Sequence, residues 1–240
     1  MLQWTDKGYI LHKRPLGEGK IVLDIFTRAH GRTAGVVRGA QSKKMRGILD
    51  CGNLIHVTWQ ARLSEQLGTY SALELETPVA MRCLSSPRQL IQLQLLATVL
   101  YHTLPERFSY PLLYDRFVQL IDHMNAPTWF QNFIHFDITL LEHLGFGLSL
   151  TKCAVSGDTK GLLYVSPKTG CAVTAAAGEV YKEKLLLLPP WLLDQSAVLT
   201  KENAQQALQL TGYFLKIHYE KLENNKEWET NRSRLLNYVA

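Results

Sequence analysis

The spacing of apolar residues changes near Pro87, and this change divides the chain into two parts with different secondary structure. Before Pro87, short runs rich in Val, Ile, Thr and aromatic residues are separated by Gly-containing turns, which is typical of strands. Ile55, Val57 and Trp59 alternate with polar residues and predict one buried and one solvated face. After Pro87, leucines recur three or four residues apart, as they do in helices. The sequence therefore predicts an α+β protein with strands first and helices second.

Five strands are predicted in the first eighty residues. They span residues 4–13, 20–27, 33–38, 54–61 and 68–76. The segment Gly17-Glu18-Gly19-Lys20 superficially resembles a phosphate-binding loop, but it joins two strands and no Ser or Thr follows the lysine, so we interpret it as a hairpin turn. Five short strands with longer third and fourth connections suit a partly closed Greek-key barrel of the OB type, although other five-stranded barrels fit the pattern almost as well.

The rest of the chain predicts a helical bundle. Ser86 and Thr200 are predicted N-caps, and the predicted helices span residues 87–101, 111–124, 127–144, 201–218 and 231–238. Residues 150–178 lose the helical spacing and gain glycines, which predicts a small irregular or β-hairpin insertion. Residues 185–193 contain Pro189-Pro190 and predict an extended segment. We therefore expect an OB domain over residues 1–80 and a helical domain over residues 81–240.

Positive charge is concentrated in the first part. The chain has 26 Lys and Arg against 21 Asp and Glu; residues 1–80 hold 11 against 7, which leaves 15 against 14 for the remainder. No acidic residue lies between Asp24 and Asp50, where the basic residues are Arg28, Arg32, Arg38, Lys43, Lys44 and Arg46. Such a cluster attracts phosphates. A solvated loop is the alternative, and the nucleic-acid prediction requires these cations to gather on one exposed side.

Bases of a bound strand need aromatic surfaces on a solvated face. Phe26 points to the same side of its strand as Asp24, and Tyr70 to the same side as Glu74, so these two are the base-stacking candidates. Packing in the core is the alternative for both. Trp59 shares parity with apolar residues and is predicted to lie in the core. The alternation does not decide between core and surface for Trp4 and Tyr9.

The sequence predicts neither catalysis nor a cofactor. Cys153 and Cys171 flank the insertion as in a zinc ribbon, but Ser156 and Thr174 stand where paired ligands would be, so no metal is expected. No constellation for nucleophilic or acid–base catalysis is recognisable. The chain also shows no apolar run of membrane-spanning length and no apolar signal core. We therefore expect a cytoplasmic protein that is not an enzyme.

Several short segments along the chain are distinctive when taken together. These segments are Trp4–Leu11, Gly17-Glu18, Phe26-Thr27-Arg28 before Gly31, Val37–Ala40, Phe136-Asp137, Leu140–Phe146 and Ser166–Gly170. In their order and spacing they resemble the RecO family of bacterial recombination mediators over essentially the whole chain. The resemblance implies an OB domain, a helical domain and a zinc-type insertion. It also implies binding of single- and double-stranded DNA, annealing of complementary strands, and help in loading recombinase onto strands coated by single-stranded DNA-binding protein (SSB).

The implied partners are RecR and the acidic C-terminal tail of SSB, and the implied location is the nucleoid. The resemblance carries DNA contact over to the six basic residues above, with Arg62 as a weaker addition. Arg107 and Arg116 are candidates for the tail. Family members with four cysteines bind zinc, so this chain departs from them; we expect apolar contacts to hold its insertion instead, from Val155, Leu162, Tyr164 and Val173. A protein-interaction scaffold whose basic barrel contacts an acidic protein or RNA is the alternative function.

Overall fold

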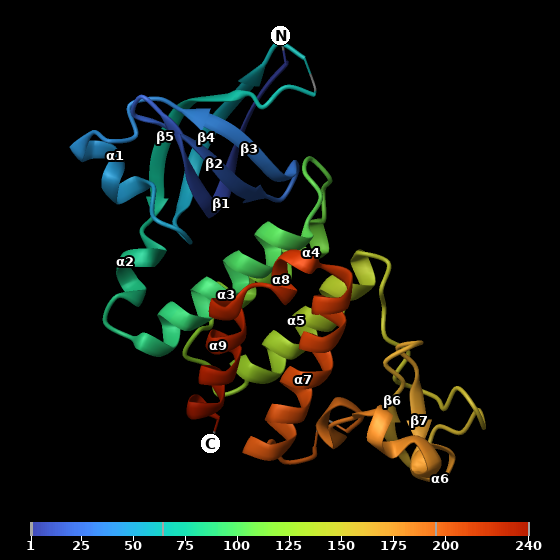
Figure 1. The fold of residues 1–240 in the computed structure, drawn as a ribbon. Helices are drawn as coiled ribbons and strands as arrows, with labels where there is room; N and C mark the ends of the chain where they lie inside the picture. Colours follow the sequence, from blue (N-terminus) through green and yellow to red (C-terminus); the bar gives the residue numbers. More distant parts are fainter. Residues whose placement is uncertain (1, 64, 195, 240) are drawn as a thin grey trace. The chain divides into compact units, whose positions relative to one another are not determined.

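The computed structural model describes residues 2–63, 65–194 and 196–239 (Figure 1). Contacts between Cα atoms divide the chain into two compact units, Met1–Asn125 and Ala126–Ala240. The predicted domain boundary near residue 80 lies inside the first of these units.

The first unit begins with a five-stranded barrel, and the five predicted strands are confirmed. They are β1 (Leu2–Gly17), β2 (Lys20–Thr27), β3 (Gly31–Val37), β4 (Leu54–Ala61) and β5 (Thr69–Thr77). Their order is β1-β2-β3-β5-β4. The long strand β1 pairs with β4 through its first half and with β2 through its second half. Strands β3 and β5 meet at the parallel pair Val36–Thr69, which brings the two ends of the sheet together.

A short helix that the sequence analysis missed covers one end of the barrel. This helix, α1 (Lys43–Ile48), lies in the connection where we expected only a loop. Ile48 and the adjacent Leu49 are buried in the barrel core, and Met45 packs against it. Their spacing of three and four residues is a helical signal, but it is short and lies among glycines.

Helices α2 (Val79–Cys83), α3 (Pro87–Thr103) and α4 (Pro111–Asp122) complete the first unit. The Ser86 hydroxyl accepts a hydrogen bond from the Gln89 N–H at 3.3 Å, so the predicted N-cap of α3 is confirmed. Phe117 of α4 makes edge contacts with Tyr9 and Phe26, at centroid distances of 5.0 and 5.9 Å. The outer face of β1 and β2 is therefore covered by helix here.

Arg32 fixes the end of α3 to the barrel. Its guanidinium lies 2.6 Å from the buried carboxylate of Asp24 on β2 and donates to the Leu104 carbonyl at 2.9 Å. Its backbone carbonyl accepts the Arg107 N–H at 2.7 Å. These contacts anchor both the C-terminus of α3 and the loop that follows it.

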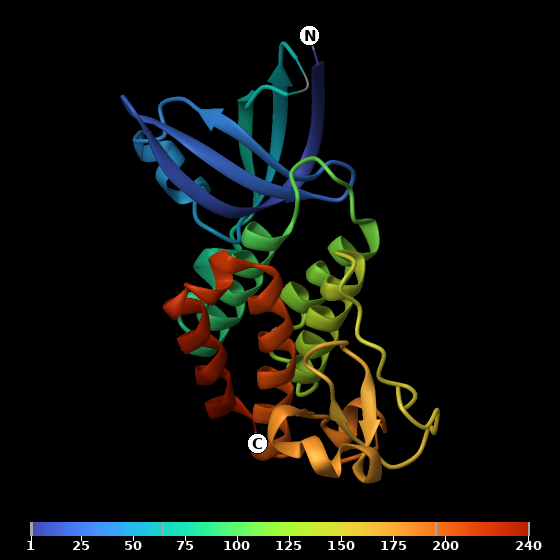
Figure 2. The ribbon, with the colours of Figure 1, turned by 45° about the vertical axis from the view of Figure 1, so that its right-hand side comes forward.

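The second unit is built around three helices, α5 (Trp129–His143), α7 (Lys201–His218) and α9 (Lys226–Leu235), which run side by side (Figures 1 and 2). The short α8 (Glu220–Glu223) and η3 (Leu236–Tyr238) flank α9. Buried Arg232 of α9 lies 2.6 Å from the Asp137 carboxylate on α5 and donates to the Thr211 hydroxyl on α7 at 2.6 Å. One charged side chain therefore connects the three helices.

The predicted insertion contains a hairpin, β6 (Leu162–Val165) with β7 (Ala172–Thr174), followed by α6 (Ala175–Gly178) and η1 (Glu179–Lys184). In the extended segment, β8 (Leu186–Leu187) adds to the sheet before η2 (Pro190–Leu192). Leu162, Tyr164 and Val173 pack around Cys153, as we expected. Val155 is 74% exposed, so its predicted core role is wrong.

Substitutions at two glycines can test how closely the loop after α3 packs on the barrel. Gly31 and Gly39 both have positive φ, +65° and +63°, but a Cβ at Gly31 would collide with the Phe108 carbonyl, whereas a Cβ at Gly39 would meet nothing within 4 Å. We expect Gly39→Ala to cost about 1 kcal/mol of backbone strain. Gly31→Ala should cost at least about 2 kcal/mol more through overpacking. Urea denaturation measures both variants, and equal losses would contradict the packing of this loop.

Arg32 provides a second test. Arg32→Ala leaves the Asp24 carboxylate buried without its partner, so we expect it to lower the free energy of unfolding by about 3–5 kcal/mol. Arg38→Ala removes an exposed cation from the same strand region and should change stability by no more than about 0.5 kcal/mol. Thermal and urea unfolding compare the two, and similar stabilities would show that Arg32 does not anchor α3.

Candidate nucleic-acid interface

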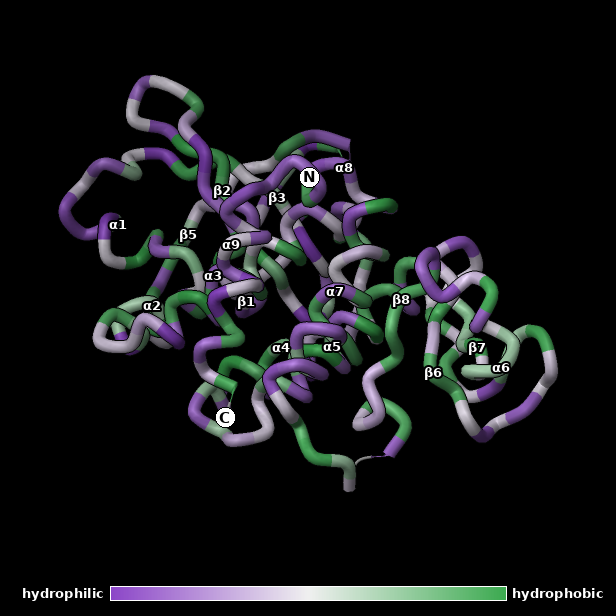
Figure 3. The backbone as a smooth tube through the Cα atoms, turned by 60° about the horizontal axis from the view of Figure 1, so that its bottom comes forward, coloured by the Kyte–Doolittle hydropathy of each residue, from purple (hydrophilic) through white to green (hydrophobic). Residues whose placement is uncertain are grey.

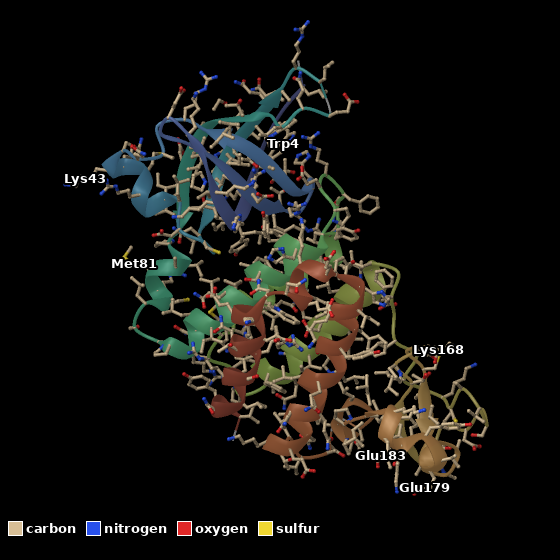
Figure 4. The ribbon with its side chains drawn as sticks, in the orientation of Figure 1. Trp4, Lys43, Met81, Lys168, Glu179 and Glu183 are labelled. Atoms are coloured by element: carbon tan, nitrogen blue, oxygen red, sulfur yellow. The ribbon has the colours of Figure 1, made fainter. Side chains whose placement is uncertain are left out.

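Four of the predicted DNA contacts are exposed to solvent. We call Arg38, Lys43, Lys44 and Arg46 the basic segment. Within residues 2–63, 65–194 and 196–239, none of the four lies within ion-pair distance of a carboxylate. Lys43 points away from the barrel in Figure 4, and the chain around α1 is largely hydrophilic in Figure 3. The basic segment is therefore available to a polyanion.

The position of the basic segment follows from the buried side of α1. Met45, Ile48 and Leu49 face the barrel core, whereas Lys43 and Lys44, which precede Met45, and Arg46, which follows it, are exposed to solvent. Buried Asn53 donates to the Gly47 and Ile48 carbonyls at 3.0 and 3.2 Å and thereby satisfies acceptors at the end of α1. The cations are thus presented from a fixed helix.

The other two basic residues of the stretch make ion pairs. Arg32 is nearly buried against Asp24, and its guanidinium also lies 3.5 Å from Glu106, so its assignment as a DNA contact is wrong. Arg28 is exposed and makes a bidentate pair with Asp115 at 2.8 and 2.9 Å. This pairing raises the pKa of Arg28 and lowers the pKa of Asp115. Solvent screens an exposed pair of this kind and makes it weak, so Arg28 remains able to exchange Asp115 for a phosphate.

The exposed cations do not form one continuous cluster. Arg28 precedes β3 and Arg38 follows it, so the seven residues of this strand separate them, roughly 23 Å at the usual rise per residue. Arg62 is exposed just after β4. Lys43 and Trp4 lie on opposite sides of the barrel in Figure 4. We expected all the predicted DNA contacts to gather on one exposed side of the barrel. Only the basic segment meets this expectation.

Phe26 is not a base-stacking surface. It is completely buried, and its ring contacts Tyr114 and Phe117 of α4 at 5.2 and 5.9 Å. Phe26 shares a face of β2 with Asp24, as predicted, but Asp24 is itself buried. The prediction is wrong because helices cover this face.

Tyr70 is not a base-stacking surface either, since it is 3% exposed and its hydroxyl donates to the Thr33 carbonyl at 2.9 Å. The register shift between Thr58 and Trp59 places Tyr70 opposite Trp59. Such a bulge changes which residues face inward. Trp59 lies in the core as predicted, with its indole N–H donating to the Ala34 carbonyl at 3.1 Å.

The two candidates for an acidic tail differ. The Arg107 guanidinium lies 5.3 Å from the Trp59 ring centroid and donates to the Gln66 carbonyl. Its contacts therefore belong to the mouth of the barrel, which the sequence analysis did not foresee. Arg116 is exposed on α4.

Cys153 lies in a tight turn of the insertion. Its buried sulfur accepts backbone N–H groups of Val155, Ser156 and Thr174 at 3.4, 3.5 and 3.4 Å. Hydrogen bonds from Ser156 are the largest cause that lowers the Cys153 pKa to about 6. Cys171 is a separate free thiol, and the described parts of the chain contain no group of three or more His, Cys, Asp or Glu that could hold a metal ion.

Two cavities bear on binding. The larger, about 530 Å³, lies along α7 and α9, where its rim residues Lys216 and Glu229 neutralise each other at 2.8 Å. The smaller, about 290 Å³, lies at the mouth of the barrel beside Trp4 and Arg107. Among the described helices, none has the length and apolar character needed to cross a membrane.

Comparisons with known proteins identify the same protein family over most of the chain. Residues 1–79 match the family described as Recombination protein O N terminal, and residues 84–227 match Recombination protein O C terminal. A DNA repair protein RecO from Rhodospirillum centenum is 43% identical over 219 residues, which cover 90% of this chain and 87% of that protein. A DNA repair protein RecO from Cereibacter sphaeroides (strain KD131) is 38% identical over 240 residues, covering 100% and 99%. The chain therefore belongs to the RecO family of DNA repair and recombination proteins.

Proposed function

We propose that this protein is a recombination mediator that binds single- and double-stranded DNA through its OB-type barrel, anneals complementary strands, and helps load recombinase onto SSB-coated strands. The observation that carries the proposal is the basic segment, where four exposed cations without acidic partners in the described chain stand on or beside α1. Lysine and arginine at a protein surface neutralise phosphates and release counterions, which gives affinity without sequence preference.

Annealing by this surface requires no bond-making residue. Two complementary strands repel each other through their phosphates, and cations that screen this repulsion raise the rate at which the strands meet. Contacts to phosphates leave the bases free to pair. The protein therefore acts as a non-enzymatic mediator.

RecR and the C-terminal tail of SSB are the proposed protein partners. The tail is acidic, and exposed Arg116 remains the candidate contact because Arg107 is occupied by Trp59 and Gln66. We place the protein with DNA in the cytoplasm. A scaffold that presents the basic segment to RNA or to an acidic protein is the alternative, and competition against single-stranded DNA distinguishes it.

The first test removes charge from the basic segment. We expect the triple variant Lys43→Ala, Lys44→Ala, Arg46→Ala to bind a labelled single-stranded oligonucleotide more weakly at low salt. Each lost phosphate contact should reduce the slope of log affinity against log salt by roughly 0.7, or about 2 for all three. Fluorescence anisotropy over a salt series measures both quantities.

A matched variant, Lys152→Ala, Lys160→Ala, Lys168→Ala, removes the same charge from exposed positions of the second unit. It should retain most of the affinity and the slope. Equal losses of affinity in the two triple variants would show that binding depends on net charge alone, and would refute the proposed surface.

The second test measures mediation itself. Complementary oligonucleotides coated with SSB should anneal faster with the wild-type protein, because it screens the phosphates and contacts the coating protein. The basic-segment variant should lose most of this acceleration, and Arg116→Ala should lose it only on SSB-coated strands. Acceleration that is the same for all three proteins would contradict both assignments.

A further inference from the structure

The smaller cavity is a slot at the mouth of the barrel, within the first unit. We call it the Trp4 slot; its principal lining residues are Trp4, His30, Thr33, Trp59, Arg107 and Ser109. They come from β1, the β2–β3 turn, β3, β4 and the loop after α3. Pairing between β1 and β2 begins at Gly8 and Thr27, so the first residues of β1 diverge from the β2–β3 turn and leave this space. At about 290 Å³ it is just below the usual size of a small-molecule site.

The wall of the slot is a stack of aromatic rings. Trp4 lies parallel to His30 at a centroid distance of 4.1 Å and an interplanar angle of 13°, and to Trp59 at 5.6 Å and 15°. Trp59 is buried, whereas Trp4 and His30 are only partly buried. The stack thus starts in the core and continues toward solvent, where a planar group can join it.

Arg107 adds a cation and hydrogen-bond donors to the same slot. Its guanidinium lies over Trp59 and donates to the Gln66 carbonyl, and its Nε has no hydrogen-bond partner in the parts of the chain that the structure describes. A buried donor without an acceptor is costly. The backbone N–H of Arg107 donates to Arg32, which fixes the residue beside the slot. A planar ligand with a carbonyl acceptor would satisfy this arrangement.

Exposed cations stand beside the slot. Arg28 lies two residues before His30, and its carbonyl accepts the hydroxyl of Ser109 at 2.9 Å. Arg62 follows the end of β4, which pairs with the first residues of β1. A planar ring flanked by phosphates is the chemistry of a nucleotide in a single strand.

We propose that the Trp4 slot receives one unstacked nucleobase of a bound single strand. This inference rests on the proposed DNA binding and deepens it, because it adds a base contact to a surface otherwise made of phosphate contacts. Stacking of a base on an aromatic side chain adds affinity and tolerates any sequence. The alternative is that Trp4 and His30 only close the mouth of the barrel.

The test compares a normal oligonucleotide with an abasic strand of equal length, which keeps the phosphates and lacks the bases. Fluorescence anisotropy at fixed salt should show the wild-type protein binding the normal strand roughly tenfold more tightly, as expected for one stacked base. His30→Ala and Trp4→Leu should reduce this ratio toward one. Both variants should bind the abasic strand like the wild type, which also confirms that they are folded. The triple basic-segment variant serves as the control, since it should weaken binding of both strands by the same factor.

Three results would overturn the inference. A wild-type ratio near one would show that no base is recognised. Equal losses of both strands in His30→Ala and Trp4→Leu would show that these residues support the fold alone. Failure of the wild-type protein to bind either strand would refute the proposed function and the inference together, whereas the first two results leave DNA binding intact.

Discussion

The first unit depends on the contacts that the Arg32 guanidinium makes. It joins the buried carboxylate of Asp24 to the end of α3, and it lies 5.6 Å from the Tyr101 ring. Burial raises the pKa of Asp24 and Arg32 opposes this shift, so the ion pair offsets the cost of burying the carboxylate. Because Arg32 also accepts the Arg107 N–H, the same residue sets the position of the loop that forms one side of the Trp4 slot.

The alternation of residues predicted the strands but not what covers their faces. Asp24 and Phe26 share a face as expected, yet that face is buried under helices whose packing involves residues far away in sequence. Periodicity gives the relative orientation of neighbouring side chains; whether a face meets water depends on tertiary contacts. Tyr70 shows a second limit, because a single bulge reverses the inward and outward positions after it.

A count of basic residues in the sequence also overstates the number of cations that a binding partner can reach. Arg32 is as cationic in the sequence as Lys43, but one sits against a buried carboxylate and the other projects into solvent. In the second unit, Arg232 occupies a buried position on α9 next to Trp228 and Leu235, where helical spacing alone would suggest an apolar residue. The sequence could therefore predict a basic barrel and a helical bundle, whereas only the ion-pair geometry separates structural cations from available ones.

The burial of Phe26 and Tyr70 changes how such a barrel would hold a strand. A row of exposed aromatic platforms would stack several bases, and each would have to be released, at roughly 1–3 kcal/mol, before it could pair with a complementary strand. The described surface instead combines exposed cations around α1 with one aromatic slot at the mouth of the barrel. Phosphate contacts leave Watson–Crick edges exposed, and a single base held in the proposed slot would fix the strand without occupying its neighbours. For a protein that anneals strands, weak and mostly backbone-directed binding is therefore more useful than tight base recognition.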